Sequence, residues 1–572
     1  MNGIGIGARA KAAKRRWPLF AGSLLTLVPL FVLGVTPPPG AGTILQQAQP
    51  IVPPSPASNQ TGLTIAPQSA GALPPSAPFA VNALSISGNS VFDAPTLHAL
   101  VADAEGKSLT LPQLQALATR LSDYYHAHGY PLARAIIPAQ TIESGRVRIE
   151  IIEARYGRID VDNGSRTSPA LLRSTLSNLR PGQVIEQGSL DHSLLLLSDI
   201  PGVVVNATLK PGEAVGSSDL LVDTPSAAVL SGSAAVDNFG NRYTGRVRGG
   251  GTLDLIEPLG YGDVLSLTGL SSGSNMDYGR IAYDSLLDGE GTRAGIAYSG
   301  LHYRLGNTLA ALDAHGIAEV ASLWAKQPLV RSPGMNLYVQ IQYDRLQLRD
   351  HIDAGDIRTD RHLDDGTISL LGDARDPLLS GALTAWTVGF TRGQVDFDDL
   401  AAQSADAGTV KSAGRFSKWT ASVNRLQNLG GAYSLYFAIS GQWASRNLDD
   451  SQKLVEGGVY TVRAYDMGAI SADTGYQETA ELRRELGSAW AGRWLALAFL
   501  DSAQLSIDRT PWVAGKNSAA LSGAGIGLNW TGPHAWSAKS YVAARLGAAP
   551  ADVRTSSAVR AWIEIDKAFQ SF

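Results

Sequence analysis

From about residue 229 to the end of the chain, apolar and polar residues alternate with a period of two. In MNLYVQIQYD, one side of an extended strand carries Met335, Leu337, Val339, Ile341 and Tyr343. YSLYFAISGQWA repeats this pattern with Leu435, Phe437, Ile439 and Trp443. Because the side chains of a strand point alternately to its two faces, the pattern predicts strands with one apolar and one polar face.

Two architectures fit such strands, a soluble sandwich and a membrane barrel. A sandwich domain usually has about 100 residues, whereas the alternation here covers roughly 340. Only 17% of all residues are charged, against about 25% in soluble domains. Strands of about ten residues, apolar outside and polar inside, are typical of outer-membrane barrels. We therefore predict a transmembrane antiparallel β-barrel over residues 229–572, with about 16 strands at roughly 21 residues per strand and connection.

The end of the chain bears on where this barrel closes. In SSAVRAWIEIDKAFQSF the best alternating set is Ala561, Ile563, Ile565 and Phe569. This set is out of phase with the terminal Phe572. The last strand is therefore expected to end near Phe569.

Residues 1–42 have the features of a secretory signal peptide: basic residues precede the apolar run WPLFAGSLLTLVPLFVLGV, and small residues and prolines follow it. A transmembrane anchor is the alternative, because the run could almost span a bilayer. The prolines favour the signal peptide, since a stop-transfer helix would be followed by charged residues. Residues 43–78 are rich in Pro, Ser, Ala and Gln and predict an extended linker. A helix at TILQQAQ would be stopped by Pro50 after barely two turns, so a plug helix there is left open.

Two small α+β units are expected between the linker and the barrel, over residues 79–154 and 155–228. In the first, Leu114, Leu117, Leu121 and Tyr124 form one apolar helical stripe that ends before Gly129. Strands ARAIIPAQ and GRVRIEIIEARY follow. The second unit repeats this order in shorter form, with the helical segments SPALLRSTLSNLRPG and SLDHSLLLLSDIPG.

Composition and motifs argue against catalysis and cofactors. The chain has no cysteine, and its formal charge of −4 gives no field for nucleic acid. GLSSG, with Ser271, matches an esterase elbow but lies at the end of a predicted hairpin without the helix that such an elbow needs. His126 and His128 are two apart on a helix and face away from each other, so no metal site is expected. GIGIGARA has no preceding strand, which removes a nucleotide-binding interpretation.

Several segments resemble the outer-membrane transporters of two-partner secretion, the haemolysin secretion/activation (TpsB) proteins of the BamA-like superfamily. LSISGNSVF and GYPLARAIIPAQTIESGRVRIEIIE look like a first POTRA domain, and LSDIPGVVVNATLKPGEAVGSSDLLVDT like a second. VDNFGNRYTGRVRGGGTLDLIEPLGYGDVLSL is similar to the first barrel hairpin of the family. The resemblance implies a Gram-negative outer-membrane protein with POTRA domains in the periplasm. It also implies a secreted TpsA-like exoprotein, of the adhesin or cytolysin class, as partner.

The resemblance also implies a functional loop. In this superfamily a long loop, here expected near residues 440–480, folds into the barrel lumen and carries a VRGY-type tip. VRAY supplies Val462, Arg463, Ala464 and Tyr465, with alanine in place of the usual glycine. FLDSA supplies the partner residues Phe499 and Asp501 on the barrel wall, with Ala503 in place of a glycine. A pair between Arg463 and Asp501 is therefore expected, because a guanidinium in a polar lumen is best matched by a carboxylate fork.

The resemblance further implies that the first POTRA domain binds the unfolded partner. The candidate edge for adding a strand of partner consists of Ala133, Arg134, Ala135, Ile136 and Ile137. Two rival functions remain at this stage. A barrel-assembly factor usually has more POTRA repeats, and a passive porin needs neither POTRA repeats nor a lumenal arginine.

Overall fold

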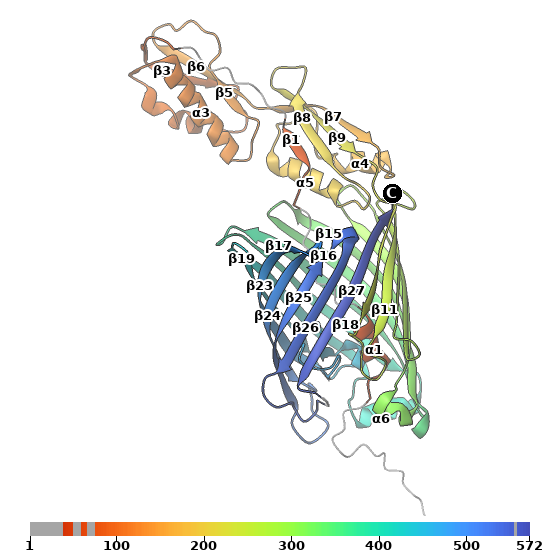
Figure 1. The fold of residues 1–572 in the computed structure, drawn as a ribbon. Helices are drawn as coiled ribbons and strands as arrows, with labels where there is room; N and C mark the ends of the chain where they lie inside the picture. Colours follow the sequence, from red (N-terminus) through yellow and green to blue (C-terminus); the bar gives the residue numbers. More distant parts are fainter. Residues whose placement is uncertain (1–37, 50–58, 66–74, 554–556, 572) are drawn as a thin grey trace, which may run out of the picture. The chain divides into compact units, whose positions relative to one another are not determined.

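The computed structural model describes residues 38–49, 59–65, 75–553 and 557–571. Most of the predicted signal peptide therefore lies outside the described residues. Within them, sixteen antiparallel strands form a closed barrel (Figure 1). The fold class predicted from the alternation is confirmed, including the strand number.

The barrel strands follow one another in chain order, interrupted once between β20 and β23. Their bounds are β10 (Leu230–Asp237), β11 (Arg248–Ile256), β12 (Val264–Ser271), β13 (Met276–Leu286), β14 (Arg293–Arg304), β15 (Ala314–Arg331), β16 (Met335–Ile352), β17 (Ile357–Asp376), β18 (Ala382–Phe397), β19 (Gly414–Gly430), β20 (Tyr433–Ala444), β23 (Thr474–Ala489), β24 (Gly492–Ser506), β25 (Ser518–Thr531), β26 (Trp536–Arg545) and β27 (Val559–Ser571). Pairing of β10 with β27, from Leu230 with Ser571 to Asp237 with Glu564, closes the barrel. Closure removes the free sheet edges, whose unpaired backbone groups could not be satisfied in lipid.

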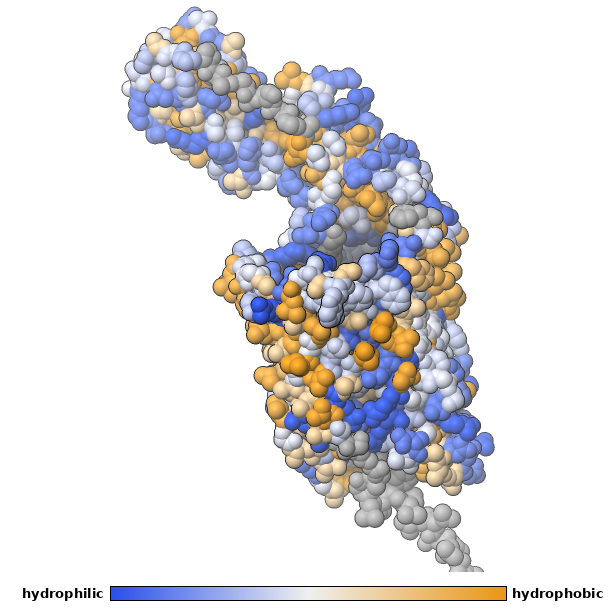
Figure 2. All heavy atoms as spheres, in the orientation of Figure 1, coloured by the Kyte–Doolittle hydropathy of each residue, from blue (hydrophilic) through white to orange (hydrophobic). Residues whose placement is uncertain are grey.

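Side chains on the outer wall are the apolar ones that the alternation predicts. Ile341 and Tyr343 on β16 and Phe437 on β20 are exposed, and Figure 2 shows orange, hydrophobic residues over the barrel strands. On β27, Ile563, Ile565 and Phe569 are exposed as expected, while Trp562, which precedes Ile563, is buried and faces inward. The strand ends at Ser571, two residues beyond the expected Phe569, because Leu230 and Ser231 still pair with Ser571 and Gln570.

The first POTRA unit is a sheet of order β3-β6-β5 packed against helices. Its elements are β2 (Phe79–Val81), β3 (Ala83–Ser87), α2 (Ala94–Ala99), η1 (Ala102–Ala104), β4 (Lys107–Leu109), α3 (Leu111–Ala127), β5 (Arg134–Ile136) and β6 (Arg146–Ile152). Thr110 and Gln113 form a capping box that starts α3. Leu114, Leu117 and Leu121 of the predicted stripe are buried in the core.

Glu153, just beyond β6, fastens the first unit together. Its carboxylate accepts hydrogen bonds from the backbone N–H groups of Ser90 (2.7 Å) and Val91 (2.8 Å) and from the Tyr125 hydroxyl (2.9 Å). Burial acts to raise the pKa of Glu153, but these donors and the Ser90 hydroxyl outweigh it and hold the pKa below its usual 4.5. The Glu153 carboxylate thus joins α3 to the turn before α2.

The second POTRA unit contains β7 (Arg155–Asn163), α4 (Pro169–Thr175), α5 (Gln187–Ser198), β8 (Asn206–Pro211) and β9 (Ser217–Thr224). Its sheet has the order β1-β8-β9-β7, in which β1 (Leu63–Ile65) comes from the stretch predicted to be an extended linker. This is a correction, because residues 63–65 are part of a sheet. Their three-residue pairing with β8 is too short to leave a periodic signal in the sequence.

Several polar contacts join the second unit to the barrel. The Arg331 side chain, fully buried at the end of β15, donates from Nε and Nη2 to the two carboxylate oxygens of Asp199, at 2.6 and 2.8 Å. The Thr167 hydroxyl donates to Glu257, after β11, at 2.6 Å. The second POTRA unit therefore contacts the end of the barrel at which Arg331 and Glu257 lie.

Shorter elements lie at the strand ends and inside the barrel. They are α1 (Ala41–Ala48), η2 (Asn307–Leu312), η3 (Asp353–Gly355), α6 (Leu400–Gly408), η4 (Asp450–Gln452), β21 (Leu454–Glu456), β22 (Ile470–Ala472) and η5 (Pro533–Ala535). None of the helices in the described ranges is long and apolar enough to cross a membrane.

Candidate functional site

The connection between β20 and β23 folds back into the barrel. It carries the small hairpin of β21 and β22, and its tip lies between these two strands. Val462, Ala464 and Tyr465 are completely buried at this tip. They pack with inward-facing residues of β24, β25 and β26, among them Leu497, Leu521 and Ala543. The loop expected near residues 440–480 therefore occupies residues 445–473, inside the lumen.

Arg463 and Asp501, expected to pair, are brought together. The Arg463 guanidinium donates from Nε and Nη2 to the two oxygens of Asp501, at 2.9 and 2.7 Å. The backbone N–H of Arg463 donates to the same carboxylate at 3.0 Å. The guanidinium also lies 3.4 Å from the ring centre of Phe499, the second wall residue of the expected motif. This bidentate and stacked arrangement requires an arginine, because a lysine has neither the fork nor the flat face.

A second acid, Glu481 on β23, was missed from the sequence. It accepts a hydrogen bond from Arg463 Nη1 at 2.6 Å and from Arg483 Nη2 at 2.7 Å. The cluster of Arg463, Arg483, Asp501 and Glu481 thus has two positive and two negative groups. The alternation of Tyr476, Ala480 and Leu482 toward lipid would have placed Glu481 and Arg483 in the lumen.

The two alanines in place of glycines have a structural explanation. The methyl group of Ala464 lies where a side chain on Gly523 of β25 would be, only 2.5 Å from the position of such a Cβ. Gly523 therefore makes the room that Ala464 needs. Ala464 has no left-handed backbone conformation, so alanine adopts the tip geometry without strain. Ala503 is fully buried on the wall of β24 behind the loop.

The residues after the arginine hold the tip at further points. The backbone oxygen of Arg463 accepts a hydrogen bond from Trp562 Nε1 on β27 at 2.7 Å. Asp466 lies between Arg560 of the same strand and Arg246, whose Nη2 is 2.9 Å from the carboxylate. The loop is thus fixed to β23 and β24 on one side and to β27 on the other.

A helix also lies within the barrel. Ile44 and Leu45 of α1 are buried against inward-facing apolar residues, among them Leu346 and Leu348 of β16 and Leu363 of β17. The segment TILQQAQ, for which a plug helix was left open, therefore forms a helix of two turns. Residues 43–48 are not part of a linker. Sequence could not decide this, because eight residues are too few for a stable isolated helix and tertiary packing stabilises it.

Polar contacts connect α1 to the lumenal loop. The Ala41 N–H donates to Asp350 Oδ1 at 2.7 Å, and Asp350 Oδ2 accepts from Arg361 Nη1 at 2.7 Å. Arg361 Nε donates to Asp449, at the start of η4 in the lumenal loop. Gln47 accepts from Asn241, and a side chain on Gly42 would lie 2.6 Å from the backbone nitrogen of Ser451. The helix and the loop therefore fill the lumen as one packed body.

The strand predicted to bind the partner, residues 133–137, makes its hydrogen bonds within its own domain. Ala135 N–H donates to the Ser122 hydroxyl of α3 at 2.9 Å, and the backbone oxygen of Ala133 is 2.8 Å from His126 Nε2. Arg134 and Ile136 pair with β6, and Ile137 packs at the margin of the core. The outer side of β5 is thus covered by α3, and no backbone donor of Ala135 is free for an added strand.

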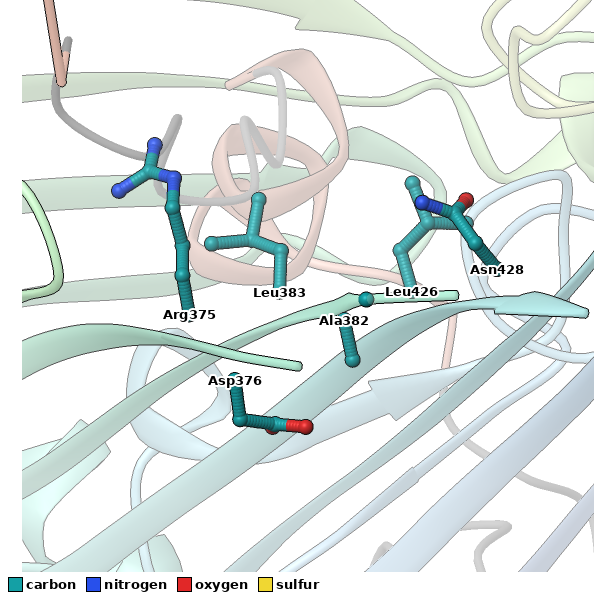
Figure 3. A pocket seen from close by; sticks show the side chains of 7 residues that line it. Arg375, Asp376, Ala382, Leu383, Leu426 and Asn428 are labelled. Carbon is teal, nitrogen blue, oxygen red and sulfur yellow. The ribbon is translucent and has the colours of Figure 1, made fainter. Parts of the chain in front are cut away.

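A pocket lies at the barrel end that contacts the second POTRA unit. Arg375 there donates to the backbone oxygen of Pro333, close to Arg331. Figure 3 shows Arg375, Leu383 and Leu426 pointing to one side of the strands and Asp376 to the other. Ile368 and Val388 are exposed toward lipid, which places Leu383 on the lumenal face by alternation. The pocket is lined by Arg375, Asp376, Gly381, Ala382, Leu383, Leu426 and Asn428.

A closed barrel with POTRA-like units ahead of it and a folded loop in its lumen defines an outer-membrane protein transporter of the BamA-like architecture. Residues 79–154 match the POTRA domain of the ShlB type. Residues 216–530 match the haemolysin secretion/activation protein family ShlB/FhaC/HecB. The chain belongs to this family, and it is a two-partner secretion transporter of the outer membrane with its POTRA domains in the periplasm.

Individual relatives agree with this assignment. The haem/haemopexin transporter protein HuxB of Haemophilus influenzae (strain 86-028NP) is 30% identical over 384 residues, which cover 67% of each chain. The outer membrane transporter CdiB of Escherichia coli is 25% identical over 487 residues, 82% of this chain and 80% of that one. The structure of CdiB from E. coli matches with a TM-score of 0.69 at 22% identity, covering 88% of this chain and 93% of that one. BamA from Haemophilus ducreyi shares the fold at a TM-score of 0.51 and 13% identity, covering 86% and 100%.

Proposed function

We propose that the POTRA domains capture an unfolded exoprotein in the periplasm and that the barrel passes it to the cell surface after the lumenal contents move aside. The partner belongs to the class of large secreted adhesins or cytolysins. HuxB is named for haem and haemopexin and CdiB for neither, so the relatives' names do not select one cargo for this chain.

The occupied lumen is the observation that supports this proposal most. A porin keeps an open aqueous channel, whereas here α1 and the loop of residues 445–473 pack together inside the wall. Their contacts with the wall combine this apolar packing with hydrogen bonds and ion pairs, as at Asp350, Arg361 and Asp501. Water or a passing polar chain can satisfy both partners of a polar contact once they separate, which suits a plug that opens and recloses.

We further propose that Val462, Arg463, Ala464 and Tyr465, with Phe499 and Asp501, form the functional clasp of the lumenal loop. Its role is to return the loop to one position after each passage. The barrel-assembly alternative assigns the same clasp to the insertion of other barrels and predicts no dependence on a dedicated exoprotein.

The experiment is co-production with a large candidate exoprotein of the TpsA class, in a Gram-negative host that lacks both. Appearance of the exoprotein in the medium, with unchanged amounts of the host's own barrels, supports the translocator. Retention of the exoprotein in the periplasm, together with rescue of a host depleted of its assembly factor, would favour the alternative. Single-channel conductance of the purified chain separates both from a porin, which would be open at rest.

A further inference from the structure

Strand β1 forms one edge of the second POTRA sheet although, in the sequence, it precedes both POTRA units. Leu63, Thr64 and Ile65 pair in parallel with Ala207, Thr208 and Leu209 of β8. The backbone oxygen of Gly62 accepts a hydrogen bond from the Ala207 N–H at 2.9 Å. The edge of β8 is therefore already bound by an extended segment, and the structure shows how such a segment is held.

The binding of β1 depends on backbone pairing and on one side chain. Leu63 packs against the core of the second unit, above Ala207. Thr64 is exposed, and Ile65 is 41% exposed. Gly62 has a φ of +62°, and a Cβ there would lie 2.1 Å from the backbone oxygen of Val205. The edge thus accepts an extended segment with a glycine followed by one apolar residue.

Two properties make β1 replaceable. It covers three residues, whereas β8 has six, so a longer segment can form more hydrogen bonds along the same edge. Parallel pairing is also slightly less stable per residue than antiparallel pairing, and the one apolar anchor, Leu63, is only partly buried. By contrast, the start of β7 at the opposite edge is covered by its own domain, since Tyr156 exchanges hydrogen bonds with Gln183 and Gly182.

We infer that residues 62–65 are a removable strand that occupies the β8 edge until an extended segment of the secreted partner replaces it. This inference rests on the proposed function for the identity of the replacing segment. In this exchange one strand replaces another. The Ala207 N–H gives up its hydrogen bond to the Gly62 carbonyl and donates to a backbone carbonyl of the partner instead. An apolar side chain of the partner takes the place of Leu63.

One test of the exchange needs no secreted partner. The probe is a labelled peptide with the sequence of residues 59–65, NQTGLTI, added to the purified full-length chain in detergent. Gly62→Val in the protein should expel its own strand and strengthen peptide binding at least tenfold, because an attached strand competes at an effective concentration near millimolar. Gly106→Val is the matched control, since Gly106 has a similar φ of +74° but open space around it. Equal binding by wild type and Gly62→Val overturns the inference.

The second test locks β1 in place. The chain has no cysteine, so Thr64→Cys with Thr208→Cys introduces one possible disulfide between register partners. The oxidised lock should lower secretion of the exoprotein at least fivefold, and reduction should restore it. The control lock, Thr208→Cys with Leu221→Cys, joins β8 to β9 within the domain and should leave secretion unchanged.

Wild-type secretion from the oxidised β1 lock overturns the inference, as does a defect that persists after reduction or appears equally in the control lock. If wild type itself secretes no exoprotein, the proposed function fails, and the peptide experiment still decides whether the β8 edge exchanges strands.

Discussion

Removing the Arg463 side chain is expected to release the lumenal loop. Arg463→Ala leaves the carboxylates of Asp501 and Glu481, 2% and 6% exposed, without the cation between them. Breaking a buried ion pair from one side costs about 3–5 kcal/mol. The lower end applies here, because Asp501 keeps the Thr479 hydroxyl at 3.1 Å and the backbone N–H of residue 463. About 3 kcal/mol corresponds to roughly a hundredfold increase in the open loop population.

The order of the single variants follows from the contacts. Asp501→Ala leaves Arg463 with Glu481, so its effect should be smaller than that of Arg463→Ala. Glu481→Ala should have the smallest effect, because the fork between Arg463 and Asp501 remains. The Arg463→Ala, Asp501→Ala double variant should be less affected than the sum of the singles by about 1–3 kcal/mol, because both residues share one contact.

Labelling of a single cysteine measures the open population. Val462→Cys places a thiol at a fully buried position within the clasp, and its rate of reaction with a maleimide reports loop opening. Arg304→Ala is the control, because Arg304 and its partner Asp313 are 54% and 48% exposed and such pairs contribute about 0–1 kcal/mol. Secretion of the exoprotein per folded barrel is measured in parallel. A labelling rate for Arg463→Ala within about twofold of the reference, with additive effects in the double variant, would refute the clasp.

Three further predictions concern other parts of the chain. Because the pKa of Glu153 is held below 4.5, its stabilisation of the first POTRA unit is complete above that pH and is lost as the pH falls through the lowered value. Glu153→Gln should remove this acid dependence and cost about 1–3 kcal/mol at pH 7, measured by hydrogen exchange of that unit. Gly42→Val should force α1 off Ser451 and raise single-channel conductance, whereas Gly249→Val, at a position with open space, should not. Gly523→Ala should impair secretion by meeting the Ala464 methyl group, and Ala464→Gly in the same chain should restore it.

The barrel could be predicted because its signal is repeated many times. Each strand must present apolar side chains to lipid, so the period of two recurs along more than half of the chain. The same rule correctly placed Ile563, Ile565 and Phe569 on the outer face of β27. It gave only an approximate strand end, since the last residues pair through the backbone whatever their side chains are.

The clasp could be expected only in part. The pair of Arg463 and Asp501 followed from the family resemblance, but Glu481 lies outside the quoted motifs and joins the cluster through the neighbouring strand. The inward-facing Leu346 and Leu348 also depart from a polar lumen. They are explained by α1, whose apolar face they bury. Such residues break the alternation rule at the place where the lumen has a protein occupant.

The two N-terminal elements are connected closely enough to influence each other. Fourteen residue steps separate Ala48, at the end of α1, from Gly62, at the start of the β1 pairing. At no more than about 3.6 Å per residue, this connection spans at most about 50 Å. If β1 leaves β8, the next fixed point is Ser76, whose hydroxyl accepts a hydrogen bond from the Leu111 N–H of the first POTRA unit at 2.8 Å. Ser76 is twenty-eight steps from Ala48, and the possible span rises to about 100 Å. Replacement of β1 therefore lengthens the tether of α1 at the moment when a captured chain needs the lumen that α1 occupies.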